Sequence, residues 1–303
     1  MGNPLLTAAL NLADHQGKTW RKNIRGGVLA KLTPGDPELK VGATDFFVFD
    51  QTPKVELVGE GANKGSQDGT PRQVVAKTYK VQITYRFSQE VMFADEDSQT
   101  EVVDNLVANV AVALSRALDL LAIHGVNPAT GIVSGSITNY FVKAGNGVGV
   151  VPRTGSAQTD IESAAALLQG AGNIATGIAF DPVYAGYLAR TKNTQNNPLY
   201  PELGLGFNFD SFQGLQAASS DTVSGRKEIV GGSVAVLAIL GDWNAFKWGV
   251  ARELPLETIQ YGDPDGNGDL KRTNEIAIRA ESYIGFAIFD ATAFAMITAG
   301  LSS

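Results

Sequence analysis

The residues best suited to chemistry lie between Asp263 and Asp269, in the order Asp-Pro-Asp-Gly-Asn-Gly-Asp. They place oxygens at the first, third and fifth positions of a calcium-binding loop and a glycine at the sixth. The twelfth position holds Asn274, where such a loop needs a bidentate carboxylate, and a strand pattern rather than a helix follows. A hairpin turn built on Asn-Gly explains the same residues. We expect a turn here, with a weak calcium site as the alternative.

Side chains for other kinds of catalysis or metal binding are scarce. The sequence has no Cys and only two His, His15 and His124, which excludes disulfides, thiolate sites and multi-histidine metal sites. It has no P-loop, nucleophile elbow or zinc-protease motif, and its one glycine-spaced run, at 145–149, precedes no helical pattern. The acidic run 95–97 precedes a long helical pattern. Carboxylates at this place interact favourably with the positive end of the helix dipole, and we prefer this interpretation to a catalytic carboxylate pair. The sequence therefore predicts neither an enzyme nor a cofactor.

Composition and charge narrow the class of protein. The 303 residues suffice for one large or two ordinary domains, and 18% are charged, against about 25% in typical soluble domains. The net charge of -7 argues against a protein that coats nucleic acid over its whole surface. Residues 1–40 form a basic N-terminal arm, which could face a polyanion or an acidic partner. Its basic cluster is Lys18, Arg21, Lys22 and Arg25. No apolar stretch approaches the roughly 20 residues that cross a bilayer, so we expect no membrane segment.

Alternating segments around a polar tip predict a long hairpin within residues 41–97. Residues 46–49, 54–58 and 74–87 are rich in β-forming side chains, and apolar and polar residues alternate in the last of them. The tip between them, residues 59–71, has four glycines and no residue able to anchor a core. A loop this long and polar is more often functional, so we expect it to project from the body. The tip region carries mixed charges at Glu60, Lys64, Asp68 and Arg72.

A long helical pattern follows the hairpin. Ser98 and Glu101 have the spacing of a capping box, apolar residues then recur at three- and four-residue steps, and Gly125 is placed to cap the C-terminus. About 25 residues at 1.5 Å each give a rod of roughly 38 Å. His124 lies in the last turn, where we expect it to be a cation at the negative end of the helix dipole.

The remaining residues predict two further regions that contain strands. Within 131–240, a second capping box at 159–162 predicts a shorter helix that ends near Gly170, and short apolar runs then alternate with turns rich in Gly and Asn. This pattern indicates an α+β lobe. From 241 to 303 the pattern is β-rich. The strands expected there lie at 256–261, 275–282, 284–289 and 294–297.

The order of these segments resembles the major capsid proteins of tailed bacteriophages, the Hong Kong 97 type. Val-Glu-Leu-Val-Gly-Glu-Gly-Ala-Asn-Lys at 55–64 resembles the rising strand and tip of the family's extended loop, and residues 79–90 resemble its returning strand. Phe-Asp-Pro at 180–182 and Asn-Pro-Leu-Tyr-Pro at 197–201 resemble turns of the axial lobe. The likeness covers roughly residues 45–297 and depends on their succession, since no single motif is diagnostic.

This resemblance implies an α+β chain with a Hong Kong 97-like capsid fold. Its implied parts are an N-terminal arm (1–40), an extended β-hairpin loop (41–97), a long spine helix (98–130), an axial α+β domain (131–240) and a peripheral β-rich domain (241–303). The implied function is structural, without catalysis or cofactor: self-assembly into the pentamers and hexamers of an icosahedral phage head around double-stranded DNA. The implied partners are other copies of the chain, a separate scaffolding protein, a portal and DNA contacted non-specifically, in a virion capsid assembled in the host bacterial cytoplasm.

The resemblance also implies roles for the charged residues of the loop tip and for the basic cluster of the arm. Glu60, Lys64, Asp68 and Arg72 would contact a neighbouring subunit, and the basic cluster of the arm would face the lumen. Leu57 and Gly65 depart from the family, whose tip often has an aromatic and a proline at these places. An encapsulin-type compartment shell, a phage tail or decoration protein, and a glycan- or calcium-binding β protein are the alternatives.

Overall fold

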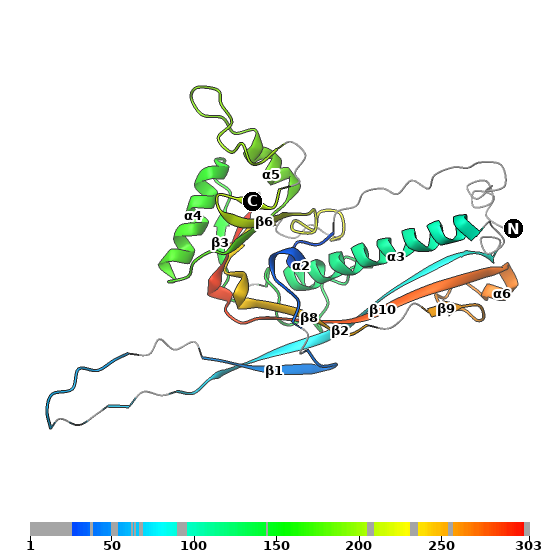
Figure 1. The fold of residues 1–303 in the computed structure, drawn as a ribbon, viewed down its shortest axis with the longest axis horizontal. Helices are drawn as coiled ribbons and strands as arrows, with labels where there is room; N and C mark the ends of the chain where they lie inside the picture. Colours follow the sequence, from blue (N-terminus) through cyan, green and yellow to red (C-terminus); the bar gives the residue numbers. More distant parts are fainter. Residues whose placement is uncertain are drawn as a thin grey trace.

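A computed structural model gives the fold of the chain, and part of each terminus and several short segments lie outside the description. The residues described are 26–36, 39–49, 54–61, 63, 65–66, 69–89, 96–143, 145–204, 209–230, 236–253 and 257–299. They form a five-stranded and a six-stranded sheet with helices beside them, so the fold is α+β. Figure 1 shows a lobe built around one sheet, a long limb in which a helix lies over the other, and a loop that projects from the opposite end.

The long limb is built on the five-stranded sheet. Its strands run in the order β1 (Ala43–Val48), β2 (Arg72–Ser88), β10 (Glu275–Ile288) and β8 (Phe246–Glu253), with β9 (Glu257–Ile259) also on β10, and every pairing is antiparallel. β2 has 17 residues, which at about 3.3 Å each span roughly 56 Å. It pairs with β1 through residues 72–77 and with β10 through residues 77–88. The long hairpin is therefore present, with β2 as its main strand.

Two expected strands differ from the structure. Residues 54–58 belong to no strand, although their sequence is rich in β-forming residues, and no described strand pairs with them. The segments 275–282 and 284–289, expected as two strands, form the single strand β10 with a register shift against β8 between Tyr283 and Ile284. A bulge of this kind bends a strand without ending it.

The long helix is α3 (Glu96–Asp119), continued by one π-helical turn (Leu120–His124). It ends as expected at Gly125, which has a φ of 66° and donates its N–H to the carbonyl of Leu121. Glycine adopts this left-handed conformation without the steric cost of a Cβ. The helix begins two residues before Ser98, so Ser98 lies inside it rather than at its cap, and the expected extension to residue 130 is a turn.

The lobe is built on the six-stranded sheet. Its order is β3 (Gly149–Pro152), β11 (Phe294–Thr298), β7 (Val236–Gly241), β4 (Gly177–Phe180), β6 (Leu215–Ser219) and β5 (Ser211–Phe212). The β3–β11 and β4–β6 pairs are parallel and the others antiparallel. β4, β7 and β11 are buried along their whole length. We expected residues 294–297 to belong with the other strands of the β-rich segment 241–303. In the structure β11 pairs instead with β3 and β7 of the lobe.

Two helices pack with this sheet, α4 (Ala157–Gly170) and α5 (Pro182–Ala189). Ser156 is the cap of α4, so the capping box expected at 159–162 was placed three residues late. Asp160, the second residue of that box, is buried and accepts hydrogen bonds from the backbone N–H of Thr154 at 2.9 Å and from its hydroxyl at 2.6 Å. The C-terminal end of α4 at Gly170 agrees with the expectation.

An aromatic core joins the lobe to the long sheet. The ring of Phe141 lies 4.9 Å from that of Phe294, 5.5 Å from Phe246 and 6.1 Å from Trp243, measured between centroids. Two 3₁₀ turns, Trp243–Ala245 and Ala291–Ala293, lead from one sheet to the other beside this core. Alternate residues of β11 contribute to it and to a second core inside the lobe. The two sheets are therefore packed as one body.

Candidate contact surfaces and a buried polar junction

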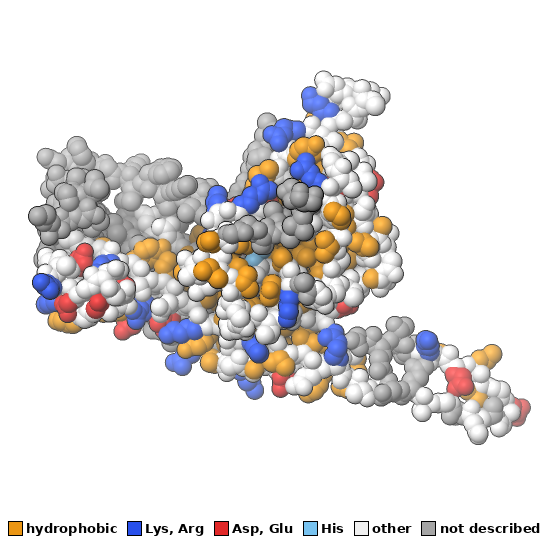
Figure 2. Space-filling view, turned by 180° about the vertical axis from the view of Figure 1, so that it is seen from behind, with side chains coloured by type: hydrophobic (Ala, Val, Ile, Leu, Met, Phe, Trp, Pro, Cys, Tyr) orange, Lys and Arg blue, Asp and Glu red, His pale blue; other side chains and the backbone are white. Residues whose placement is uncertain are grey.

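The projecting loop presents apolar side chains that no described part of the chain covers. Val55 is 99% exposed and Leu57 is 100% exposed, and every described residue from 54 to 70 is exposed. Figure 2 shows hydrophobic side chains on this loop, far from the body. Burying a side chain of this size contributes about 1.5–3 kcal/mol. The loop therefore has a surface that gains stability only from contact with another molecule.

The four charged residues expected at the loop tip have different positions. Glu60 is exposed, whereas Lys64 and Asp68 lie outside the described residues. Arg72 begins β2, and its guanidinium donates a hydrogen bond to the carbonyl of Phe289 in the same chain. Arg72 thus holds the base of the loop to the body. The basic cluster of the arm, Lys18, Arg21, Lys22 and Arg25, also lies outside the described residues.

A groove of about 1050 Å³ lies between α3 and β2. The consecutive residues 78–83 of β2 line one side of it, so the groove follows the strand. Much of its lining is apolar. The apolar walls include Tyr79, Val81 and Ile83 of β2 and Val112, Ala113 and Ala117 of α3. This groove and the projecting loop both offer apolar surface to a partner.

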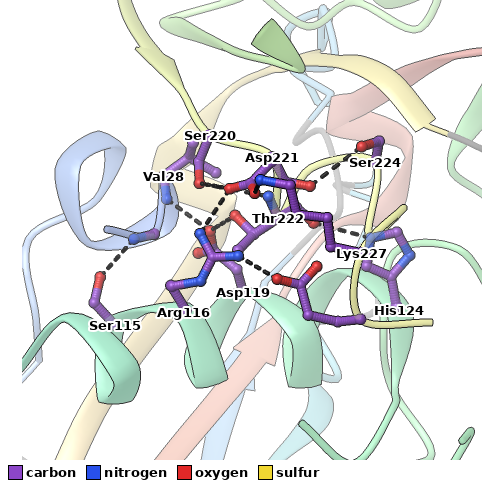
Figure 3. Close-up of polar contacts among 12 residues, drawn as sticks. Val28, Ser115, Arg116, Asp119, His124, Ser220, Asp221, Thr222, Ser224 and Lys227 are labelled. Carbon is purple, nitrogen blue, oxygen red and sulfur yellow. Dashed lines mark hydrogen bonds and ion pairs between the residues drawn. The ribbon is translucent and has the colours of Figure 1, made fainter. Parts of the chain in front are cut away.

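A buried carboxylate connects the end of α3 to the start of the described chain. Asp119 is 0% exposed and accepts hydrogen bonds from the backbone N–H groups of Val28, at 2.7 Å, and Leu29, at 3.1 Å. These amides lie at the start of the short helix α2 (Leu29–Leu32), so Asp119 caps α2 from a distant part of the chain. The hydroxyl of Thr222 donates a third hydrogen bond to Asp119 (Figure 3).

Ion pairs fasten the segment 220–229 to the same part of α3. Arg116, one turn before Asp119, donates to Asp221 at 2.6 Å and to Glu228 (Figure 3). Lys227 also pairs with Asp221. At the helix end, Nε2 of His124 lies 3.1 Å from the carbonyl oxygens of both Thr222 and Val223. We call Arg116, Asp119, His124, Asp221 and Thr222 the polar junction.

The charge states in the polar junction follow from burial and hydrogen bonding. Burial raises the pKa of Asp119 to about 6, against the opposing effect of its hydrogen bonds from Thr222, Val28 and Leu29. Burial also opposes the ionisation of Asp221, but hydrogen bonds from Arg116 and Lys227 outweigh it and hold its pKa near 2. The charge states of Asp119 and Asp221 therefore depend on the packing of α3 against residues 28–29 and the segment 220–229.

The expectation that His124 is a cation was wrong. His124 is 3% exposed, and burial lowers its pKa to about 4, so its imidazole is neutral at pH 7. Desolvation of the charged form outweighs both the helix dipole and the two carbonyl contacts. Since Nε2 faces two carbonyl oxygens, the neutral ring carries its proton there and donates it.

The polar junction was not predicted from the sequence, although the sequence contains a signal for it. Arg116 and Asp119 are the only acidic or basic residues, His124 aside, in the mostly apolar stretch 105–124. Charged residues within a run that is otherwise buried are rarely unpaired. Their spacing of three residues places them on one side of a helix, facing a common partner. The arrangement is suited to holding segments together, because Asp119 is fully enclosed and its oxygens are already hydrogen-bonded.

The segment 263–269 lies in the connection between β9 and β10, which pair with each other, but this connection is longer than the expected Asn-Gly hairpin turn because a short helix follows the segment. Asp269 caps the short helix α6 (Leu270–Thr273), accepting from the N–H of Lys271 at 2.8 Å. Asp265 accepts from the side chain of Asn267 at 3.0 Å. Within the described ranges, no group of three acidic or histidine side chains is placed to hold a metal ion. Over the same ranges, no helix combines the length and apolar character of a membrane span.

Comparisons with known proteins agree on one family. Residues 25–299 match the model described as the Phage capsid family. The solved structure titled Mycobacterium phage Ogopogo contains a chain 38% identical to this one, with a TM-score of 0.82 over 97% of this chain and 99% of that chain. A chain of Gordonia phage Cozz is 26% identical, with a TM-score of 0.77 over 95% and 91% of the two chains. A chain titled as the capsid of a native GTA particle shares the fold, with 15% identity and a TM-score of 0.64 over 99% of each. No curated protein matches the chain.

Proposed function

The chain belongs to the phage capsid family and is a structural capsid protein, and we propose that its copies form the pentamers and hexamers of an icosahedral phage head around double-stranded DNA. As a member of this family it is a component of the virion capsid rather than an enzyme. Its assembly in the host bacterial cytoplasm, together with a separate scaffolding protein and a portal, is part of the proposal.

We assign the elements of the structure to the parts of the Hong Kong 97-like fold. β1, the projecting loop and the first half of β2 would be the extended loop, and α3 would be the spine helix. The six-stranded sheet with α4 and α5 would be the axial domain, to which β11 is added here. The remaining five-stranded sheet would be the peripheral domain. The segment before residue 40 would be the N-terminal arm.

One observation carries the proposal: a long hairpin that projects from the body with Val55 and Leu57 fully exposed. In a monomer this surface is left in water, which favours aggregation over solubility. In a closed shell each loop lies across a neighbouring subunit and its apolar side chains are buried. The mixed charges at the tip, Glu60 among them, would then help to set the register of that contact.

The charge distribution along the chain supports a shell subunit with different inner and outer faces. The basic cluster of the arm gives residues 1–40 a positive balance, while the chain as a whole has a net charge of -7. Lys18, Arg21, Lys22 and Arg25 would face the lumen and contact DNA or an acidic scaffold without base specificity. The anchoring of α2 by Asp119 would fix the point from which this arm leaves the body.

Deletion of residues 59–71 tests the proposal. The deleted residues include no part of β1 or β2, so we expect the variant to keep the circular dichroism spectrum and the unfolding midpoint of the full chain. We also expect it to form no closed shells in electron micrographs taken beside the full chain under the same conditions. Normal particles from the deleted chain would refute the role given to the loop.

A further inference from the structure

We propose that Asn267 is a site of spontaneous deamidation, where the folded chain converts an amide side chain to a carboxylate without an enzyme. The sequence contains Asn followed by Gly at two places, Asn146–Gly147 and Asn267–Gly268. Glycine suits this reaction because it has no Cβ beside the attacking nitrogen and adopts backbone conformations that other residues rarely adopt. The surroundings of the two pairs differ, and of the two only Asn267 is free to react.

The reaction needs water and hydroxide but no other reagent. The backbone nitrogen of Gly268 gives up its proton and attacks Cγ of Asn267, so that a new C–N bond closes a five-membered succinimide ring. The side-chain nitrogen takes a proton from water and leaves as ammonia. Water then opens the ring, at Cγ to give aspartate or at the backbone carbonyl to give isoaspartate. One water is consumed and one ammonia is released overall, and nothing is oxidised or reduced.

The side chain of Asn267 is exposed and weakly held. Among the described residues, its carboxamide forms one hydrogen bond, from Nδ2 to Oδ2 of Asp265 at 3.0 Å, and Asp265 is itself exposed, so water can replace this bond. Gly268 is exposed with a φ of 103°, and a Cβ there would have no atom within 4 Å. No described residue accepts a hydrogen bond from its N–H. The attacking nitrogen and its target are therefore both open to solvent.

Two arginines of the long sheet hold the segment around Asn267. Arg279 of β10 donates to the carbonyl of Pro264 at 2.7 Å, and Arg86 of β2 donates to the carbonyl of Gly268. The elements that flank this segment, β9 and α6, lie at the end of the long limb away from the projecting loop (Figure 1). The guanidinium of Arg86 places a positive charge beside Gly268, where it favours the negative charge that develops on the attacking nitrogen.

The carboxamide of Asn146 is held on all sides. Its Nδ2 donates to the carbonyls of Tyr140, at 2.9 Å, and Phe141, at 2.8 Å, and its Oδ1 accepts from the N–H of Val148 at 3.0 Å. Asn146 is also partly buried, whereas Asn267 is exposed. Attack by the nitrogen of Gly147 requires the carboxamide to turn, which breaks these hydrogen bonds together. The fold therefore protects Asn146.

Deamidation would change the charge at this end of the limb. The segment already carries Asp263, Asp265 and Asp269, and the new carboxylate would lie where Asn267 now donates to Asp265. Loss of that donor and repulsion between like charges would loosen the turn, and isoaspartate would also lengthen the main chain by one carbon. Each subunit would therefore gain one negative charge with time at a defined surface position.

Peptide mass spectrometry tests the assignment, because trypsin releases the two pairs in separate peptides, 144–153 and 253–271. The purified full chain is kept at pH 8 in ¹⁸O-labelled water for several weeks and then digested in ordinary water, and the fraction of each Asn converted to an acid with one ¹⁸O is measured. Three hydrogen bonds must break together before Asn146 reacts, so we expect Asn267 to convert at least about tenfold faster. The rate at Asn267 should rise between pH 7 and pH 9, since the attacking nitrogen must lose its proton.

The same chain unfolded in guanidinium chloride is the matched control. Both carboxamides are then free, and because each is followed by Gly, the two sites should convert within about threefold of each other. Asn267→Gln should leave the peptide 253–271 unconverted, because the longer side chain closes a six-membered ring far more slowly, and this excludes Gln260 as the source. Equal rates at the two sites of the folded chain, conversion of Asn267 only after unfolding, or conversion of the variant peptide would each overturn the proposal.

Discussion

Asp119 brings together three parts of the chain that are far apart in sequence. Its carboxylate accepts from the N–H groups of Val28 and Leu29 and from the hydroxyl of Thr222, while Arg116 holds Asp221 beside it. The neighbouring Gly27 shows how closely the segments approach, because a Cβ there would lie 2.3 Å from the carbonyl of Ser115. The base of the arm therefore has one position on α3.

Asp119→Ala should destabilise the unassembled subunit by roughly 2–4 kcal/mol, because the amides of Val28 and Leu29 would be left buried without an acceptor. Urea unfolding measures the difference. Asp210→Ala is the control, since Asp210 pairs with Lys31 but its side chain is 87% exposed, and its loss should cost less than about 1 kcal/mol. Equal effects of the two substitutions would show that Asp119 does not anchor the arm.

The buried His124 should make the subunit sensitive to acid. Its pKa falls from 6.5 to about 4 on folding, so the unfolded chain takes up the proton first and stability is lost as the pH falls through this window. The full effect corresponds to about 3 kcal/mol. Asp119 acts in the opposite direction: its pKa rises from 3.8 to about 6, so its contribution is present below pH 3.8 and lost as the pH rises through 6.

His124→Gln separates these two effects. Urea unfolding of both proteins at pH 7 and pH 4 should show the stability difference between them moving by about 3 kcal/mol in favour of the variant at the lower pH. A difference that does not change with pH would mean that His124 is not buried as a neutral ring.

For single residues, the sequence shows which side chains could pair or ionise, but not which groups surround them in the folded chain. The spacing of Arg116 and Asp119 was readable, whereas their partners Val28, Asp221 and Thr222 are about 90 to 110 positions away and meet them only through tertiary packing. The charge of His124 was misjudged because the helix dipole can be read from sequence and burial cannot. Asp160 was taken for part of a cap for the same reason.

Among the elements, β11 has the position that most affects the architecture. It lies between the edge strand β3 and β7 in the lobe sheet, although it comes from the C-terminal end of the described chain. Its two faces contribute to two different cores, with Met296 in one and Ile297 in the other. The lobe is therefore completed only when this last strand is in place.

Truncation before residue 294 should unfold the lobe, because β3 and β7 would both lose their shared neighbour and two cores would open. Limited proteolysis should cut the truncated chain within 149–241, and its unfolding transition should lose cooperativity. Removal of residues 301–303 alone leaves β11 whole and should change neither result. A stable, protease-resistant lobe without β11 would contradict this account of the sheet.

The elements with strong periodicity were predictable, and their pairings less so. The alternation along β2 and the end of α3 at Gly125 depend on local sequence, and both agree with the structure. The joining of two expected segments into β10 and the transfer of β11 to the lobe depend on which strands lie alongside, which periodicity does not encode. The missing strand at 54–58 has a different cause, since its sequence favours β structure but no described strand pairs with it.

Considered as a whole, the molecule has a shape suited to neighbours on several sides. The lobe, the long limb and the projecting loop extend in different directions (Figure 1). The aromatic core packs where the lobe meets the long sheet. Only 18% of residues are charged, which suits a subunit whose surface is largely covered by other copies. The exposed apolar side chains on the loop and the apolar groove along α3 are consistent with contacts between copies.

Electron microscopy of the purified full chain under assembly conditions tests the central claim most directly. The account predicts closed shells with pentamers and hexamers, in which each projecting loop lies across the neighbouring subunit. Shells that enclose an enzyme cargo instead of DNA would point to an encapsulin-type compartment, and rings or tubes would point to a tail protein. Monomers that form no closed particle, alone or with a scaffolding protein, would contradict the claim that this chain builds a phage head.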